Sequence, residues 1–269
     1  MASIQGTLLQ KLYYAYFLSG GHPGKLRICR WVRRILRDAR VLTPFFEGQI
    51  YADESDFVER HILRSGDYEP EVRDALLQFA ERDEVLWDIG AHVGTTSLPL
   101  RNHPAVREIR AFEPHPEARD RLRRNLERNP GRATYEICDL GLGDRDEVLT
   151  ISDGREGNSS TAALGGPGRF QIHTVTLDSC VKNWGSYPTL IKIDVEGWES
   201  NVFRGASETL QAHPPKAVVF EAETTRTGDL VDPGILDLLP GYKVSRIPRP
   251  EGTIESRENF LATLPRNPG

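Results

Sequence analysis

One segment, Val85 to Thr96, limits the folds open to this chain more than any other. Its apolar start predicts a strand buried on both faces of a parallel sheet. The strand leads into the pattern Asp-x-Gly-x-x-x-Gly at Asp88, Gly90 and Gly94, in which the glycines allow close approach of the backbone to a ligand. A dinucleotide fingerprint requires Gly-x-Gly-x-x-Gly, and Ala91-His92 breaks that spacing. The segment therefore predicts a turn that binds a nucleoside rather than a dinucleotide.

A second acidic residue supports this interpretation. Residues 108–112 predict another short strand, and Glu113 follows it, 25 positions beyond Asp88. Nucleotide-binding α/β folds hold ribose hydroxyls with an acid at the end of the second strand, about 20 residues past the first turn. We expect Glu113 to bind a ribose. The alternatives are a solvated loop acid before Pro114 and an ordinary tight turn at the glycines.

Composition sets the class of protein. The chain has 269 residues, of which 38% are apolar and 27% charged, as in an ordinary globular protein. A net charge of −5 provides no general field for nucleic acid, so we expect no nucleic-acid partner. Three scattered cysteines, Cys29, Cys138 and Cys180, form no C-x-x-C pair. They indicate neither a zinc site nor a disulfide framework, and a reducing cytoplasmic setting fits them best.

The N-terminal region differs from the rest. The apolar stretch Leu8–Leu18 is interrupted by Lys11 and is too short to span a bilayer, so we expect no signal peptide and no transmembrane helix. Residues 25–40 predict an amphipathic helix with an arginine face. This helix either packs on the main domain or on a second subunit of a homodimer, or contacts an anionic surface or a lipid-linked or phosphorylated substrate. We divide the chain into a helical extension, residues 1–45, and a main domain, residues 46–269.

Strand and helix patterns alternate from Asp88 onward. They predict a mostly parallel, doubly wound α/β sheet, with a helix running from Glu196 to about Gln211 and a flexible binding loop over residues 153–168. Ligands of such sheets bind at the carboxyl ends of the strands. Five acids fall at predicted strand ends: Asp88, Glu113, Asp139, Asp194 and Glu221. Their coincidence predicts one shared site.

Two of these acids are suited to a catalytic role. Asp194 and Glu221 end neighbouring strands, where they can hold a hard cation such as Mg²⁺ or accept a proton from a bound hydroxyl. The alternative is that they only cap the helices that follow. Among the other histidines, His173 has the best claim to a catalytic role because it follows the predicted binding loop.

Several motifs together carry a resemblance to a known family. They are Asp88–Gly94, Phe112-Glu113-Pro114, Thr176-Leu177-Asp178, the tract Lys192–Glu199 with Phe203–Ala206, and Asn259–Ala262. The chain resembles the FkbM family of S-adenosylmethionine-dependent methyltransferases from about Gly48 to Leu264. The tract Lys-Ile-Asp-Val-Glu-Gly is its most specific part.

The resemblance implies a Rossmann-like, seven-stranded class I methyltransferase sheet with an antiparallel last strand. It also implies O-methylation of a sugar or of a glycosylated or polyketide natural product. Asp88, Gly90 and Gly94 would line the methionine part of the cofactor, Glu113 its ribose, and Asp139 with Leu140 its adenine. His92 stands where the family often has Asn, which argues against a role as base. The implied cofactor-binding residues are Tyr68, Glu69, Asp88, Gly90, Ala91, His92, Gly94, Thr95, Thr96, Glu113, Pro114, Asp139, Leu140 and Asp194.

The mechanism has two open routes. Either a carboxylate or a histidine takes the proton of the acceptor hydroxyl, or a divalent cation on Asp194 and Glu221 lowers the pKa of that hydroxyl. Two other functions compete with methyl transfer: a nucleotide-dependent oxidoreductase, which the missing dinucleotide glycines disfavour, and a non-catalytic binding module on the same fold.

Overall fold

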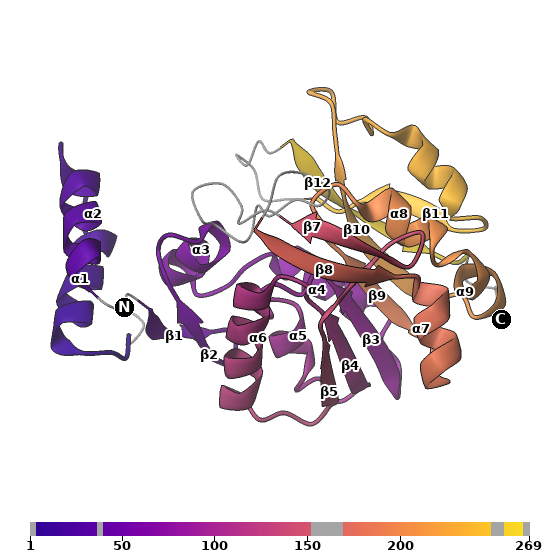
Figure 1. The fold of residues 1–269 in the computed structure, drawn as a ribbon, viewed down its shortest axis with the longest axis horizontal. Coiled ribbons are helices and arrows are strands. Elements are labelled where there is room, and N and C mark those ends of the chain that lie inside the picture. The colour runs from indigo at the N-terminus through magenta and orange to yellow at the C-terminus, as the bar shows by residue number, and fades with distance from the viewer. Residues whose placement is uncertain (1–3, 37–39, 152–168, 249–255, 266–269) are drawn as a thin grey trace.

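The computed structural model describes residues 4–36, 40–151, 169–248 and 256–265 (Figure 1). The predicted binding loop over residues 153–168 lies outside these ranges. The elements of the described chain build a central sheet, a smaller sheet beside it and a helical N-terminal region.

The main sheet has seven strands in the order β11-β12-β10-β9-β3-β4-β5. The five strands from β10 to β5 are parallel, and β12 runs antiparallel to both of its neighbours. The predicted sheet with an antiparallel last strand is therefore confirmed. The bounds are β3 Glu84–Ile89, β4 Val106–Phe112, β5 Thr134–Cys138, β9 Leu190–Ile193, β10 Ala217–Glu223, β11 Lys243–Arg246 and β12 Arg257–Thr263.

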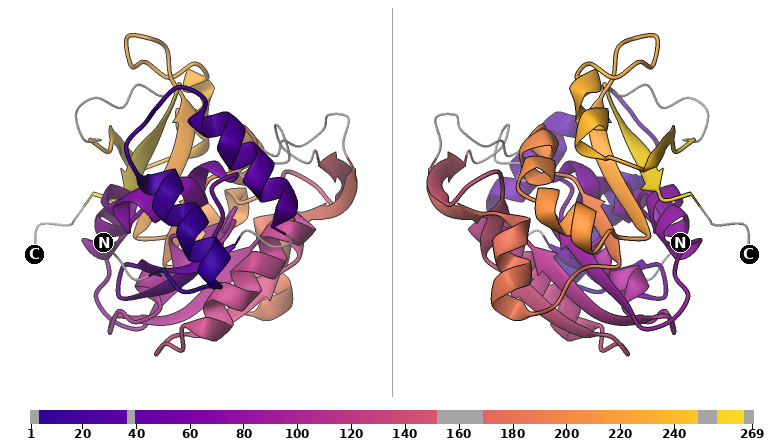
Figure 2. Two further views of the ribbon diagram at one scale, coloured as in Figure 1. Left: turned by 90° about the vertical axis from the view of Figure 1, so that its left-hand side faces the viewer. Right: turned by 90° about the vertical axis from the view of Figure 1, so that its right-hand side faces the viewer.

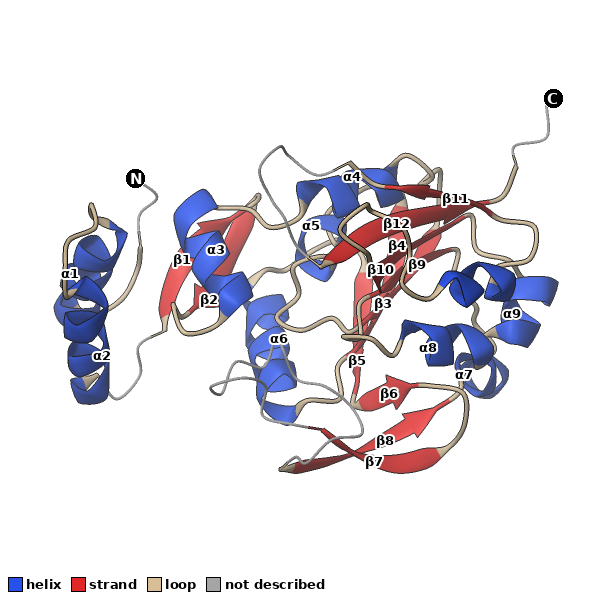
Figure 3. Cartoon of the chain, turned by 90° about the horizontal axis from the view of Figure 1, so that it is seen from above, coloured by secondary structure: helices blue, strands red, loops and turns tan. Residues whose placement is uncertain are grey.

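Helices cover both faces of this sheet, as a doubly wound fold requires. Alternate residues of β3 show it: Trp87 and Ile89 pack in one core with α7 and α8, whereas Leu86 packs in another with α4. Figure 3 shows α4 and α5 on one side of the sheet and α7 to α9 on the other. The bounds are α4 Pro70–Leu77, α5 Ser97–Leu100, α6 Pro116–Arg128, α7 Leu177–Trp184, α8 Glu199–Arg204 and α9 Ser207–Ala212. All six residues of β3 are buried, which explains its continuous apolar character.

A second sheet of three strands stands beside the first, in the order β6-β8-β7. Its strands are β6 Leu140–Leu142, β7 Glu147–Ile151 and β8 Phe170–Val175. Strand β6 follows β5 almost directly, so the small sheet begins at the carboxyl end of the large one. A 3₁₀ helix, η2, covers Pro233–Leu238.

The N-terminal region contains two helices rather than one, α1 Leu8–Leu18 and α2 Lys25–Ile35, which cover one end of the molecule (Figure 2, left). A hairpin follows, β1 Val41–Phe45 with β2 Gly48–Ala52, and then α3 Phe57–Ser65. The expected boundary between residues 45 and 46 falls inside this hairpin. Within the described ranges, no helix has the length and apolar content needed to cross a bilayer.

The helix predicted from Glu196 to Gln211 is wrong in two places. Glu196 and Gly197 adopt left-handed φ angles of 55° and 97°, so the chain turns and helix α8 begins only at Glu199. A break at Gly205 and Ala206 then separates α8 from α9. At this break the carbonyl of Gly205 accepts a hydrogen bond from the backbone N–H of Asp178, at 2.9 Å. A long-range contact thus interrupts a segment whose local pattern is helical.

Candidate active site

The site lies where the order of the strands reverses. From β3 the chain proceeds to β4 and β5 on one side, and later returns to β9 and β10 on the other. Backbone hydrogen bonds join the strand ends: Asp194 N donates to Ile89 O at 2.9 Å, and Gly90 N to Phe112 O at 3.0 Å. Ligands of open α/β sheets bind in the crevice at such a point.

A cavity of about 510 Å³ opens at these strand ends. It is bounded by residues at the ends of β3, β4 and β9 and directly after them, by Glu221 of β10, by the start of α3 and by strands of the small sheet. The lining residues are Phe57, Val58, Tyr68, Ile89, Gly90, His92, Thr95, Phe112, Glu113, Pro114, His115, Leu140, Gly141, Leu142, Ile151, Lys192, Asp194, Val195, Glu196, Glu221, Ser256 and Arg257. This size suits one small-molecule ligand.

Glu113 is held in a fixed position at the wall of the cavity. Its Oε2 accepts the backbone N–H of His92 at 2.7 Å, and its Oε1 accepts that of His115 at 2.8 Å. Burial raises the pKa of the Glu113 carboxyl, and the nearby His92 works in the opposite direction. Each carboxylate oxygen can accept more than one hydrogen bond, so the side chain can also accept from a pair of ligand hydroxyls.

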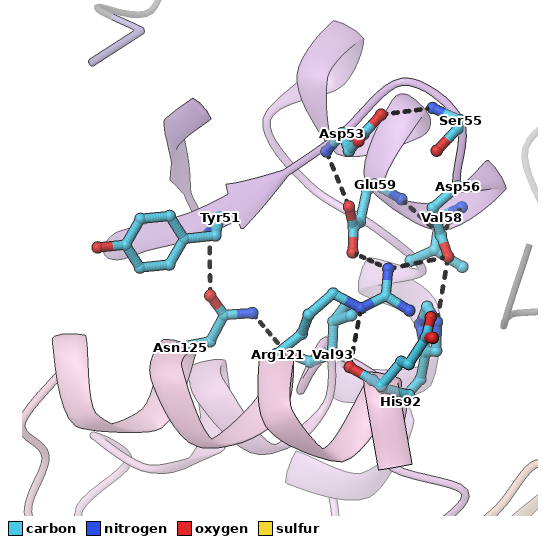
Figure 4. Close-up of polar contacts among 12 residues, drawn as sticks. Tyr51, Asp53, Ser55, Asp56, Val58, Glu59, His92, Val93, Arg121 and Asn125 are labelled. Carbon is cyan, nitrogen blue, oxygen red and sulfur yellow. Dashed lines mark hydrogen bonds and ion pairs between the residues drawn. The ribbon is translucent and has the colours of Figure 1, made fainter. Parts of the chain in front are cut away.

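A buried network of charges supports the cavity from the side of α3 and α6 (Figure 4). Arg121 Nη1 lies 2.7 Å from Glu59 Oε1 and 3.4 Å from Asp56 Oδ2. His92 Nε2 lies 3.3 Å from the same Asp56 oxygen. Burial alone would lower the pKa of His92, but the carboxylate of Asp56 outweighs it and raises that pKa. The contact between His92 and Asp56 thus ties the turn after β3 to the start of α3.

Asp194 is paired with a buried lysine from its own strand. Lys192 Nζ lies 3.0 Å from Asp194 Oδ2 and 3.4 Å from the carbonyl of Gly90. Burial alone would lower the pKa of Lys192, but the carboxylates of Asp194 and Asp88 raise it and hold the ammonium charged. Asp88 itself is fully buried beneath the cavity, where its Oδ2 accepts a hydrogen bond from Ser97 at 2.5 Å. Asp88 thus supports the turn after β3 from beneath the cavity.

Three further charged side chains converge on the other side of Asp194. Arg257 Nη1 lies 3.1 Å from Glu221 Oε2 and 3.8 Å from Glu196 Oε2. Burial and the neighbouring Asp194 raise the pKa of Glu221 to about 9 and that of Glu196 to about 7. Both side chains therefore hold a proton more readily than an ordinary glutamate, although the charge of Arg257 works in the opposite direction.

The cavity brings together nine of the predicted site residues and leaves out seven. Those that line it are Tyr68, Gly90, His92, Thr95, Glu113, Pro114, Leu140, Asp194 and Glu221. Within the described chain, Glu69, Asp88, Ala91, Gly94, Thr96, Asp139 and His173 are not among its lining residues. Asp139 and His173 are exposed and line a separate depression on the far side of Leu140. The structure therefore does not bring His173 to Asp194.

The predicted Mg²⁺ site does not fit these residues. In the described ranges, no three or more His, Cys, Asp or Glu side chains are arranged to hold a metal ion. The ammonium of Lys192 lies against Asp194, and the guanidinium of Arg257 lies against Glu221. Each carboxylate thus already has a cationic partner, and the methyl transfer proposed for this site involves no metal ion.

Three charged residues of the lining, Lys192, Glu196 and Arg257, were not predicted as site residues. Lys192 and Glu196 belong to the tract that carries the family resemblance. Their position near the end of a predicted strand could have indicated both of them. Arg257 is the first residue of β12, and nothing in its local sequence indicates that it reaches Glu221, 36 positions away.

The fold and the site define a class of protein: a Rossmann-like methyltransferase, with a mostly parallel sheet, an antiparallel β12 and an acid-lined cavity at the switch point. A family model described as the methyltransferase FkbM domain matches residues 88–243. The chain belongs to the FkbM family of methyltransferases.

Individual proteins are also similar to this chain, and the first of them supports the assignment by its sequence identity. The chain is 32% identical over 197 residues to the hexuronic acid methyltransferase AglP of Haloferax volcanii, which covers 70% of this chain and 80% of that protein. Among solved structures, the precorrin-6y C5,15-methyltransferase of Geobacter metallireducens covers 72% of this chain and 88% of its own, with 18% identity and a TM-score of 0.44. The TYW2 protein of M. jannaschii in complex with AdoMet covers 84% and 85%, with 13% identity and a TM-score of 0.45.

Proposed function

We propose that this chain is an O-methyltransferase that moves a methyl group from S-adenosylmethionine to a hydroxyl of a sugar, and specifically of a hexuronic acid. The observation that carries the proposal is the arrangement of the cavity lining, where Glu113, which we assign to the ribose, shares one cavity with Asp194 and Glu196 after β9 and with Glu221 of β10. The family and the name of the similar protein from Haloferax volcanii support the reaction and the acceptor class.

The cavity residues fit the parts of the cofactor. Glu113, anchored by two backbone N–H groups, suits the two ribose hydroxyls. Leu140, Leu142 and Ile151 give the apolar wall that an adenine ring needs, and they come from the small sheet. Tyr68 and Gly90 line the region that remains for the methionine part. Asp88 and Gly94 act from behind this lining, through the shape of the turn.

The reaction needs alignment and a proton acceptor. The acceptor oxygen forms the new bond to the methyl carbon, the carbon–sulfur bond breaks with its electron pair remaining on sulfur, and the hydroxyl proton must go to a base. We assign that base as Glu196. Its side chain lines the cavity, is 35% exposed and has its pKa raised to about 7, first by burial and then by Asp194. A base with a pKa near the working pH is the most effective.

Backbone geometry supports the same assignment. Glu196 has a φ of 55°, a left-handed conformation that costs a non-glycine residue energy. Residues held in such conformations concentrate at functional sites. Because of this turn, helix α8 begins only at Glu199, and the carboxylate of Glu196 remains on the cavity wall.

Asp194 and Glu221 have supporting roles in this proposal. Asp194 is 29% exposed at its side chain and accepts a hydrogen bond from Lys192, so it can orient an acceptor hydroxyl without moving. Glu221 accepts a hydrogen bond from Arg257, which holds its side chain at the cavity wall, where it can form a hydrogen bond with the acceptor hydroxyl. The three cysteines of the chain are free and buried, which agrees with a cytoplasmic setting.

Binding and turnover test the proposal separately. In calorimetric titrations we expect S-adenosylhomocysteine to bind and NAD not to bind. With S-adenosylmethionine carrying a labelled methyl group, we expect label transfer to glucuronic or galacturonic acid, free or within a glycan, and less to glucose. Mild alkali hydrolyses a methyl ester and leaves a methyl ether intact, so survival of the label shows transfer to a hydroxyl.

Three results would contradict this proposal. Binding of NAD alone would favour an oxidoreductase. Binding of S-adenosylhomocysteine without transfer to any sugar of a broad panel would favour a non-catalytic module. Label that mild alkali removes would place the methyl group on the carboxylate of the acid instead of on a hydroxyl.

A further inference from the structure

Helix α1 is apolar on the side that faces away from the protein. Its inner face is buried through Tyr13, Tyr14 and Phe17, as expected of a surface helix. Its outer face carries Leu8, Leu9 and Leu12, which are 75%, 51% and 60% exposed. A surface helix of a globular protein normally presents polar residues there. The exposed leucines therefore require a separate explanation.

Helix α2 continues the pattern and adds positive charge. Ile28, Trp31 and Ile35 are spaced three and four residues apart, which places them on one helical face, and they are 45%, 62% and 56% exposed. Arg27 and Arg34 are exposed beside that face. The outer side of α2 is thus half apolar and half cationic.

The inner faces of the two helices fix this orientation. The hydroxyls of Tyr13 and Tyr14 donate to the two carboxylate oxygens of Glu54, the latter at 2.9 Å. Arg33 of α2 donates to the same carboxylate at 3.0 Å and also pairs with Asp53. Because both helices are attached through these bonds to the chain after β2, their outer faces stay directed to solvent.

The two outer faces belong to one end of the molecule, which faces the viewer in the left panel of Figure 2. This end is strongly basic in sequence. Residues 1–40 contain eight Lys and Arg and one acidic residue, whereas the rest of the chain contains 26 and 38. An anionic surface attracts such a basic end and repels the acidic remainder of the protein, so the protein is oriented with this end toward the surface.

We propose that the outer faces of α1 and α2 bind the surface of an anionic phospholipid bilayer, with both helices lying in the plane of the interface. The apolar side chains defined above would enter the headgroup region, and Arg27 and Arg34 would pair with phosphates. Leucine, isoleucine and tryptophan opposite basic residues are the composition of interfacial helices. This inference does not depend on the proposed methyl transfer.

Charge argues against a second copy as the occupant. In a twofold dimer through this face, the same patch of both copies forms the contact. The cationic patch with Arg27 and Arg34 would then lie against the identical cationic patch of the second copy. Such like-charge contacts disfavour association. Nucleic acid would satisfy the arginines but leaves the exposed leucines without a role. An anionic bilayer satisfies both sets of residues.

The docking end is close to the active site through α3. Ile62 and Leu63 of α3 pack in the same core cluster as Tyr13, Tyr14 and Phe17, and Phe57 and Val58 at its start line the cavity. One helix therefore separates the membrane-binding face from the cofactor cavity. Docking would hold the cavity at a constant distance from the bilayer.

Co-sedimentation of the full chain with vesicles tests the proposal. We expect binding to vesicles of phosphatidylcholine mixed with phosphatidylglycerol, weaker binding to phosphatidylcholine alone, and weakening by salt. The variant L8S/L12S/W31S should lower the partition constant at least about tenfold, since each lost apolar side chain removes favourable burial. R27Q/R34Q should lower binding to the anionic vesicles only. The control V148S/V231S removes comparably exposed apolar residues elsewhere and should change nothing.

Parallel measurements keep the outcome decisive. Thermal melting of each variant should match that of the unmodified chain, because all the substituted residues are exposed. The fluorescence of Trp31, isolated as the difference between the protein and its W31F variant, should shift to the blue on binding anionic vesicles. Absence of binding to anionic vesicles would overturn the proposal. So would a dimer in light scattering that L8S/L12S/W31S dissociates, or duplex DNA binding that exceeds binding to the vesicles.

Discussion

Gly90 and Asp194 approach each other so closely that a Cβ atom at Gly90 would lie 1.8 Å from the carbonyl oxygen of Asp194. Gly90 begins the turn after β3, and Asp194 follows β9, so this contact closes the switch point of the sheet. Gly90 also has a φ of 80°, which favours glycine. Because residue 90 has no side chain, the backbone of Asp194 can approach the turn, and its carboxylate reaches the cavity.

Replacement of Gly90 by alanine should destabilise the protein and impair cofactor binding together. The left-handed φ costs about 1–2 kcal/mol and the steric overlap about 1–3 kcal/mol more. Urea denaturation and S-adenosylhomocysteine titration measure the two effects. Gly185→Ala is the matched control, because Gly185 has a φ of 60° and nothing within 4 Å of its would-be Cβ. Equal losses of stability in the two variants would show that the contact with Asp194 is unimportant.

Glu113 and Asp194 should separate binding from turnover. Glu113→Ala removes the charged acceptor proposed for the ribose hydroxyls and should weaken S-adenosylhomocysteine binding by about 10-fold to 100-fold. Asp194→Asn keeps the shape of the site and should lower kcat strongly while it leaves cofactor affinity nearly intact. Calorimetry and label transfer at saturating cofactor distinguish the two effects. Equal loss of affinity in both variants would refute this division of roles.

The features predicted correctly from sequence are those set by neighbouring residues. The buried β3 strand, the glycine turn and Glu113 at the end of β4 all lie within short segments whose patterns are local. The alternation of strands and helices then predicts the sheet, because parallel strands require crossover connections. Lys192 and Asp194 also lie only two residues apart, so their ion pair could have been predicted from the sequence, although no role was predicted for the lysine.

The features that were missed depend on contacts between distant segments. The ion pair of His92 with Asp56 and that of Arg257 with Glu221 each join residues 36 positions apart. Register between β10 and β12, which pairs Glu221 with Asn259, brings Arg257 to the site. The metal expected at Asp194 and Glu221 is not supported for a related reason: each acid lies against a cationic side chain, and the pairing of Arg257 with Glu221 joins distant segments of the chain.

The pH dependence of turnover tests Glu196 as base. Because Glu196 must be deprotonated to accept the hydroxyl proton, kcat should rise with pH toward about 7, its raised pKa, and then level off. Glu196→Gln should lower kcat by about a hundredfold or more and remove that rise. Glu223→Gln, at an exposed position of β10, is the control and should keep the normal profile. A rise that persists in Glu196→Gln would assign it to another group.

His92 should make stability depend on pH. Although burial opposes it, Asp56 raises the pKa of His92 in the folded protein above the value of an unfolded chain, about 6.5. The stabilisation from this pair is therefore fully present below about pH 6.5 and is lost as the pH rises through the folded pKa. Glu59, whose pKa is raised to about 7 by burial, titrates in an overlapping range, so the informative quantity is a difference between two proteins. The unfolding free energy of the unmodified protein minus that of His92→Gln should shrink as the pH is raised, whereas the same difference for His213→Gln, at an exposed histidine, should change less. A difference for His92→Gln that does not vary with pH would mean that His92 is neutral beside Asp56, and that the ion pair does not hold the turn after β3.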